Sequence, residues 1–164
     1  MLVVGIDPGT ATTGYAFVSE AAEDGCLRVV DVGVILTPSA LPQQERLLII
    51  YQKLSNLLAA HRPTCGAVEK LFFQRNVTSA IAVGQARGVV LLALAEAGVP
   101  VNEYSPVEVK QAVAGYGAAD KKQMQQMVRL LLGLQEVPQP DDAADALALA
   151  ICHLHSSGWL QLSH

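Results

Sequence analysis

Five short runs of apolar residues, each bounded by a turn signal, predict five β-strands along the chain. The first run ends at Asp7, Pro8 and Gly9, and an uninterrupted apolar run that stops at such a turn is typical of a central strand. Asp24 and Gly25 form a hairpin signal between the second and third runs, so we expect the first three strands to be antiparallel. The predicted strands cover residues 2–6, 14–18, 27–36, 65–71 and 99–104.

Apolar residues recur at helical spacing in the segments that follow the third strand. Residues 47–58 carry apolar side chains on one face of a helix that ends before Pro63. Residues 80–97 are apolar on most sides, with Arg87 as the only charge before Glu96, which is typical of a helix buried in the core or against a second copy of the chain. The remaining predicted helices begin at Pro106 after a Ser105 cap, after Asp120, and at Asp141 or Asp142.

This order of elements predicts an α/β domain in which helices flank both faces of a five-stranded mixed sheet. The length of 164 residues fits a single domain spanning residues 1–164, and 51% apolar against 16% charged residues excludes a disordered chain. No run of about 18 uncharged apolar residues is present, so we expect no membrane span. The amino-terminal apolar run lacks a basic leader, so we also expect no secretory signal.

The three cysteines, Cys26, Cys65 and Cys152, are odd in number and far apart in the sequence. Because they form no C-x-x-C pair, they encode neither a disulfide framework nor a zinc site. We expect them to be small buried residues of a protein that resides in the reducing cytoplasm.

Charge is distributed unevenly along the chain, although the total formal charge is only −4. Residues 1–61 carry a net charge of −3, residues 62–129 a net charge of +3, and residues 130–164 a net charge of −4. A basic middle between acidic ends suits a surface that binds a polyanion beside a cluster of carboxylates. Two divalent cations would neutralise the total, so its sign does not exclude a nucleic-acid partner.

Acidic residues stand at positions where the chain otherwise favours apolar side chains. Asp7 and Glu69 each end a predicted buried strand, where an unpaired charge is costly. Asp142 and Asp145 are three apart at the start of the last helix and share a face, but Asp141 and Asp145, four apart, do so as well. Carboxylates suit hard divalent cations, and a two-ion site can activate water for cleavage of a phosphodiester. The spacing alone also fits ordinary structural roles, with Asp7 as a turn former, Asp142 as a helix cap and Asp145 as a solvated helix residue.

Four segments carry a resemblance to a known family: GIDPGTATTGYA, AVEKLFFQRN, IAVGQARGV and DDAADALALAICH. Together and in order, over nearly the whole chain, they resemble the RuvC family of Holliday-junction resolvases. The resemblance implies an RNase H-like fold and a homodimeric endonuclease that makes paired symmetric nicks in four-way DNA junctions during recombination and repair. The family's acidic metal ligands fall on Asp7, Glu69, Asp142 and Asp145, because the last two begin and end the D-A-A-D string that Asp141 precedes.

The same resemblance implies cofactors, partners and roles. It implies two Mg²⁺ ions per subunit, with Mn²⁺ able to replace them, and the branch-migration proteins RuvA and RuvB as partners. Residues 80–97, in which Gly84 and Gly88 allow close backbone approach, are our candidate for the dimer interface. In the mechanism that we infer, Asp7 bridges both ions, the other ligands complete the coordination, and the scissile phosphate is stabilised by Lys121 and Lys110.

Aromatic and basic residues near the Glu69 strand are candidates for DNA binding. By default Phe72 and Phe73 would be core residues, but the resemblance places an aromatic three residues past the strand glutamate, so we expect Phe72 to stack on a base at the crossover and Phe73 to pack. Helix lysines are usually solvated, yet two of them match basic residues of the family near the scissile phosphate. The expected DNA-binding residues are Phe72, Lys70, Arg75, Lys110 and Lys122.

Two other functions remain open from the sequence. A D-P-G-T loop after a first strand also occurs in the actin and sugar-kinase superfold, so a single-domain module that binds nucleotide or phosphate is one alternative. An RNase H-like nuclease that acts on RNA is the other. ATP binding without DNA cleavage would favour the first, and preference for structured RNA over four-way DNA would favour the second.

Overall fold

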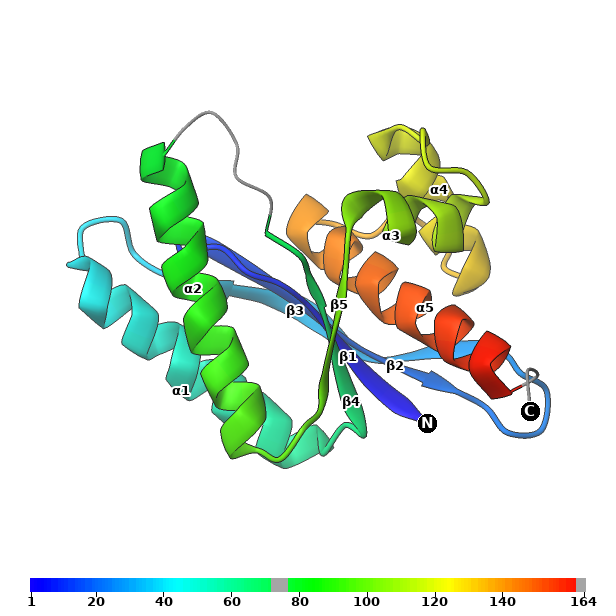
Figure 1. The fold of residues 1–164 in the computed structure, drawn as a ribbon, viewed down its shortest axis with the longest axis horizontal. Helices are drawn as coiled ribbons and strands as arrows, with labels where there is room; N and C mark the ends of the chain where they lie inside the picture. Colours follow the sequence, from blue (N-terminus) through cyan, green and yellow to red (C-terminus); the bar gives the residue numbers. More distant parts are fainter. Residues whose placement is uncertain (72–76, 162–164) are drawn as a thin grey trace.

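A five-stranded mixed sheet forms the middle layer of the molecule (Figure 1). The structure is a computed structural model that describes residues 1–71 and 77–161, without the side chains of residues 158–161. The strands are β1 (Leu2–Asp7), β2 (Thr12–Glu20), β3 (Leu27–Leu36), β4 (Cys65–Glu69) and β5 (Val101–Tyr104). In the order β3-β2-β1-β4-β5, β1 occupies the centre, antiparallel to β2 and parallel to β4.

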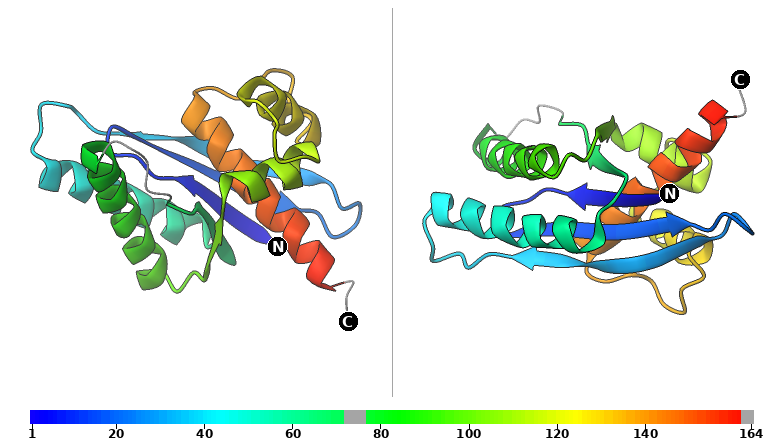
Figure 2. Two further views of the ribbon diagram at one scale, coloured as in Figure 1. Left: turned by 45° about the horizontal axis from the view of Figure 1, so that its top comes forward. Right: turned by 90° about the horizontal axis from the view of Figure 1, so that it is seen from below.

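Helices cover both faces of the sheet (Figure 1, Figure 2). One face carries α1 (Gln43–His61) and α2 (Val77–Glu96), which pack on each other. The other face carries α3 (Pro106–Ala114), α4 (Lys121–Leu131) and α5 (Asp141–Gln161). The strands, their pairing and the two helical layers confirm the predicted α/β architecture.

Side chains of the central strand divide between two hydrophobic cores. Val3 of β1 packs with Ala16 and Val18 of β2 under α5, whereas Val4 and Ile6 belong to the core beneath α1 and α2. This alternation follows from the period of two in a strand whose two faces are both covered. The continuous apolar run at the start of the sequence is therefore a strand buried on both faces.

Two glycines let α5 approach the sheet more closely than other residues would allow. A Cβ added at Gly5 would overlap the carbonyl oxygen of Ala146, and one added at Gly14 would overlap the carbonyl oxygen of Asp142. Gly14 is also the partner of Asp7 in the β1–β2 ladder. The close approach at Gly14 therefore brings the first turn of α5 to the end of β1.

The apolar helix α2 packs through only part of its surface. Its length and composition alone would allow it to cross a membrane, which differs from our expectation that no segment would. One such helix is weak evidence, because core helices can meet the same criterion. In this fold α2 contacts α1, and its buried residues are Ala86, Val90, Ala93 and Leu94.

Two of the three cysteines are buried, but Cys26 is exposed between β2 and β3, so our expectation for it was wrong. Cys65 begins β4, and its Sγ lies 3.1 Å from Nε2 of the buried His153 on α5. The other ring nitrogen of His153, Nδ1, lies 2.7 Å from the hydroxyl of Tyr104 at the end of β5. His153 therefore joins α5 to two strands as a structural residue.

Candidate active site

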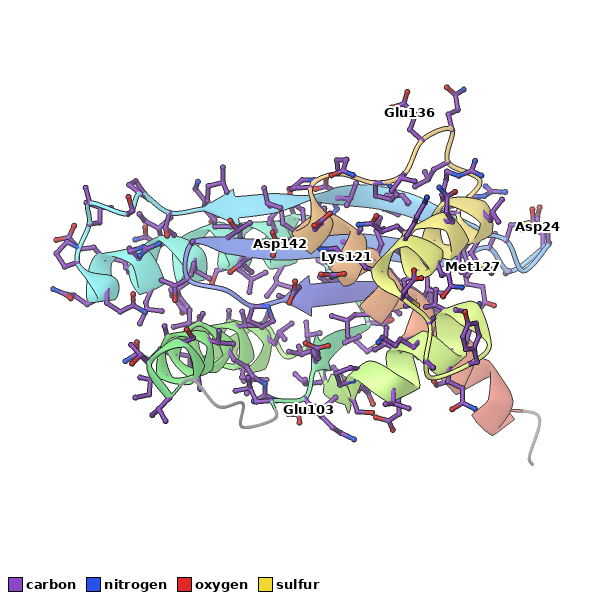
Figure 3. All side chains as sticks on the ribbon, turned by 90° about the horizontal axis from the view of Figure 1, so that it is seen from above. Asp24, Glu103, Lys121, Met127, Glu136 and Asp142 are labelled. Carbon is purple, nitrogen blue, oxygen red and sulfur yellow. The ribbon has the colours of Figure 1, made fainter. Side chains whose placement is uncertain are left out.

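The acidic residues singled out in the sequence come together where the central strands end. Asp7 ends β1 and Glu69 ends β4, and because these strands are parallel neighbours their carboxyl ends lie at one edge of the sheet. Asp142 and Asp145 come from the first turns of α5, which the close approach at Gly14 brings to the same edge. Figure 3 labels Asp142 at this position.

Asp7 is at the centre of this acidic cluster. Its pKa is raised from 3.8 to about 7, first by burial and then by repulsion from Asp145, Glu69 and Asp142, while Lys121 lowers it. Carboxylates from β1, β4 and α5 thus act on one another across one site. The ionised form of Asp7 is disfavoured there unless further positive charge is supplied.

Two further acids of the cluster are also less acidic than usual. Burial raises the pKa of Glu69, and repulsion from Asp145 adds to the effect. Loss of hydration raises the pKa of Asp145; Lys121 opposes this shift, and repulsion from Asp142 and Asp141 adds to it. Several perturbed pKa values in one cleft are typical of functional sites.

A cavity of about 250 Å³ opens beside these acids on the α5 side of the sheet. Asp7, Glu69 and Asp145 line it, and Lys110 of α3 and Lys121 of α4 contribute the basic side chains. Acidic and basic side chains therefore line the same cavity, which suits a site that binds metal cations and a phosphate group together. The rest of the lining is Pro106, Val109, Met124, Ala148 and Leu149.

The donor set of this site fits hard divalent cations. All four acids offer carboxylate oxygens, which are the ligands that Mg²⁺ and Mn²⁺ prefer. Within residues 1–71 and 77–161, no group of three carboxylate, imidazole or thiolate side chains is positioned to hold a metal ion by itself. Mg²⁺ does not require such a group, because it keeps several waters and takes one or two carboxylates together with phosphate oxygens of a substrate.

Asp141 differs from the other acids because its carboxylate is paired with Lys121. Its carboxylate forms an ion pair with Lys121 and accepts a hydrogen bond of 3.0 Å from Nε2 of Gln125. The hydrogen bond from Lys121 is the main reason why the pKa of Asp141 lies below its usual value. Repulsion from Asp142, and not from Asp141, contributes to the raised pKa of Asp7. The contacts therefore favour Asp142 over Asp141 as the partner of Asp145 in holding a metal.

The expected DNA-binding residues differ in where the structure places them. Lys110 lies on the cavity wall, and Lys122 is exposed on α4 outside the cavity lining. Lys70 directs its Nζ to Oε2 of Glu108, 3.4 Å away, at the start of α3. Phe72 and Arg75, together with Phe73, lie outside the described residues.

Two residues near the site were not assigned a role from the sequence. Gly14 is where the first turn of α5 touches the sheet. Arg87 of α2 donates from Nε to the carbonyl oxygen of Glu69 at 3.3 Å. Its isolation as a single charge in an apolar helix was the available signal for a specific contact.

Comparison with known proteins decides the family. A family model described as Crossover junction endodeoxyribonuclease RuvC matches residues 3–153 of the chain. The chain belongs to the RuvC family. It is 60% identical to the crossover junction endodeoxyribonuclease RuvC of Chloroflexus aggregans over 161 residues, which cover 98% of this chain and 97% of that protein. RuvC of Roseiflexus sp. (strain RS-1) is 58% identical over 154 residues, covering 94% and 90%.

Solved structures of RuvC and related resolvases share this fold. T. thermophilus RuvC in complex with a Holliday junction substrate matches with a TM-score of 0.90 and 42% identity, covering 96% of this chain and 94% of that one. A yeast mitochondrial Holliday junction resolvase, at 16% identity and a TM-score of 0.70, shares the fold. The expected RNase H-like fold is confirmed, and the RuvC family is one of metal-dependent nucleases. These comparisons support neither the nucleotide-binding alternative nor the RNA nuclease.

Proposed function

We propose that this chain is a metal-dependent endonuclease that resolves four-way DNA junctions by paired symmetric nicks during recombination and repair. The observation that carries the proposal is that Asp7, Glu69 and Asp145 line one cavity of a RuvC-family chain, with Asp142 in the adjoining first turn of α5. Support for the substrate comes from the T. thermophilus relative, which is described in complex with a Holliday junction substrate.

In this proposal Asp7, Glu69, Asp142 and Asp145 would hold two Mg²⁺ ions, which Mn²⁺ could replace. Bound ions of this kind supply an activated nucleophile and stabilise charge on the transferred phosphate. Asp7 and Glu69 are fixed by paired strands, so their carboxylates need little reorganisation. Asp142 and Asp145 lie near the amino terminus of α5, where the helix dipole favours ionised carboxylates.

Two lysines on the cavity wall would stabilise the phosphate. The hydrogen bond to Asp141 raises the pKa of Lys121 above its usual value, so its ammonium group stays protonated. A protonated lysine in this position donates a hydrogen bond to a phosphate oxygen and offsets the charge that develops in the transition state. Lys110 lines the same cavity from α3 and would act on the same phosphate.

Cleavage of a synthetic four-way junction tests the proposed function. We expect nicks at symmetric positions in two opposed strands with Mg²⁺ or Mn²⁺, and none with a chelator, because the ions would supply the activated nucleophile. A linear duplex and a structured RNA of matched length are the controls. Cutting that persists in chelator, or RNA cut as fast as the junction, would contradict the proposal.

The exposed row of α2 supports a homodimer. Val77, Ile81 and Leu92 have exposed fractions of 69%, 57% and 60%, and an added Cβ at Gly88 on the same row would meet nothing within 4 Å. Exposed apolar side chains on one side of a helix are candidates for an interaction surface. Symmetric nicks need two active sites related by a two-fold axis, so we propose that a second copy of the chain covers this row.

Replacing Ile81 by glutamate should convert the dimer to monomers, because it places like charges on both sides of the proposed contact. Sedimentation velocity measures the change, and the paired nicking of one junction should be lost with it. Leu130→Glu is the matched control, since Leu130 is also an exposed apolar residue, at 59%, on α4 of the opposite layer. An Ile81→Glu protein that sediments as the wild type does would rule out this interface.

The remaining roles are proposed on the resemblance and the charges. Phe72, Arg75, Lys70 and Lys122 would contact the DNA arms, and the branch-migration proteins RuvA and RuvB would act on the same junction. Two cores on the faces of one sheet support a single domain over residues 1–164. Action on chromosomal DNA supports a cytoplasmic location.

A further inference from the structure

Arg87 is a nearly buried charge in the apolar helix α2. Its side chain is only 15% exposed, and it makes two directed contacts. The Nη2 atom lies 2.6 Å from Oε1 of Glu103 on β5. The Nε atom donates to the backbone carbonyl oxygen of Glu69 at 3.3 Å. One guanidinium therefore joins α2 to the ends of two strands.

We propose that Arg87 is a positioning residue for Glu69, acting through its hydrogen bond to the Glu69 carbonyl. This inference rests on the proposed function, because it takes the Glu69 carboxylate to be a metal ligand. The carboxylate lines the cavity on the α5 side of the sheet, whereas Arg87 belongs to the helical layer on the opposite side. Arg87 thus contacts the backbone of Glu69 from the α2 side of the sheet, while the Glu69 side chain lies among the acids on the α5 side.

The position of Glu69 explains why such support is needed. Glu69 is the last residue of β4, and after it the chain leaves the sheet. The next residue, Lys70, still donates from its backbone N to the carbonyl oxygen of Tyr104 at 2.8 Å. A carbonyl at a strand end has no further ladder partner, and a donor from elsewhere fixes its plane. With the carbonyl fixed, the Glu69 side chain leaves the backbone in one direction.

The chemistry of arginine suits this double role. A guanidinium presents donors in a rigid planar fork, so it can bond Glu103 and the Glu69 carbonyl at the same time, whereas the single ammonium of lysine cannot reproduce that geometry. Glu103 compensates the buried charge, since an unpaired charge in this place would be strongly destabilising. Removal of the carbonyl contact and removal of the ion pair are therefore separable by substitution.

The test compares Arg87→Lys with Glu103→Gln in the full-length protein. Arg87→Lys keeps a positive charge beside Glu103 but loses the second directed donor, whereas Glu103→Gln keeps the donor to Glu69 and removes the ion pair. Mn²⁺ affinity is measured by calorimetry on metal-stripped protein, alongside thermal unfolding and junction binding in chelator. We expect Arg87→Lys to bind Mn²⁺ about 10-fold to 100-fold more weakly, the range found when groups supporting metal ligands are removed. Its junction binding should be unchanged.

Glu103→Gln should show the opposite pattern, with lower thermal stability but Mn²⁺ affinity close to that of the wild type. Arg87→Lys with wild-type Mn²⁺ affinity, or equal losses of affinity in both variants, would overturn the positioning role, because Arg87 would then be only a structural ion pair. A wild-type protein that neither binds Mn²⁺ nor cuts junctions would instead refute the proposed function, so the two failures are distinguishable.

Discussion

Replacing Asp7 by asparagine should abolish junction cutting while leaving junction binding in place. Asp7 is the acid on which Asp145, Glu69 and Asp142 all act, so its loss removes the central ligand of the proposed metal site. Metal ions supply several kcal/mol of transition-state stabilisation, which corresponds to a rate loss of about a thousandfold or more. Single-turnover cleavage and a gel-shift assay in chelator measure the two effects.

The same substitution should stabilise the metal-free protein. The pKa of Asp7 is about 7 in the folded state against 3.8 as its ordinary value, so the folded protein binds a proton that the unfolded chain has released between these limits. Stability should therefore fall as the pH rises from about 4 to about 7, and this fall should be smaller in Asp7→Asn, where only the raised pKa values of Glu69 and Asp145 remain to cause it. At pH 8 in chelator we expect a gain of roughly 2–4 kcal/mol in unfolding free energy.

Urea unfolding across this pH range measures the gain, and Glu136→Gln is the control, because Glu136 is an exposed acid in the loop before α5 (Figure 3). The control should unfold and cut as the wild type does. Undiminished cutting by Asp7→Asn would remove Asp7 from the site. A variant less stable than the wild type in chelator would show that the acids do not repel one another.

Replacing Gly14 by alanine should damage both the fold and the site. The added Cβ would overlap the carbonyl oxygen of Asp142 and lie 3.2 Å from the amide nitrogen of Ala143, and these are backbone atoms that cannot rotate away. The first turn of α5 must then move from the sheet, which carries Asp142 away from Asp7. Overpacking of this kind costs about 3 kcal/mol, and we expect cutting to fall at least about tenfold.

Gly66→Ala is the matched control for this prediction, because Gly66 is also a buried strand glycine. There the nearest atoms to an added Cβ are the Cδ2 and Cδ1 atoms of Leu94, at 3.2 and 3.4 Å, and a flexible side chain can give way. The control should lose less stability and keep its cutting activity. Urea unfolding and junction cleavage compare the two variants. Gly14→Ala with wild-type stability and activity would contradict the close approach.

The fold could be predicted because its signals are local. Apolar runs and turn residues place all five strands, and helical spacing places the helices that cover both faces. Local patterns also misled: Cys26 was expected to be buried because cysteines usually are, but it lies in the exposed connection between β2 and β3. β4 ends at Glu69, although the predicted strand extended to Leu71.

The site was less accessible to sequence reasoning, because its decisive contacts join distant segments. Spacing could not choose between Asp141 and Asp142, since residues three and four before Asp145 share its helix face. The structure favours Asp142 because Lys121, on another helix, engages Asp141. The packing role of Gly14 depends in the same way on where α5 lies, which no pattern within its own loop records.

The central claim is that carboxylates from β1, β4 and α5 form one metal site. Calorimetric titration of Mn²⁺ into metal-stripped protein tests it most directly, with each acid neutralised in turn. We predict that Asp7→Asn, Glu69→Gln, Asp142→Asn and Asp145→Asn each weaken binding about tenfold or more, while the neighbouring Asp141→Asn binds nearly as the wild type does. Wild-type affinity in Glu69→Gln or Asp145→Asn, or an equal loss in Asp141→Asn, would contradict the account.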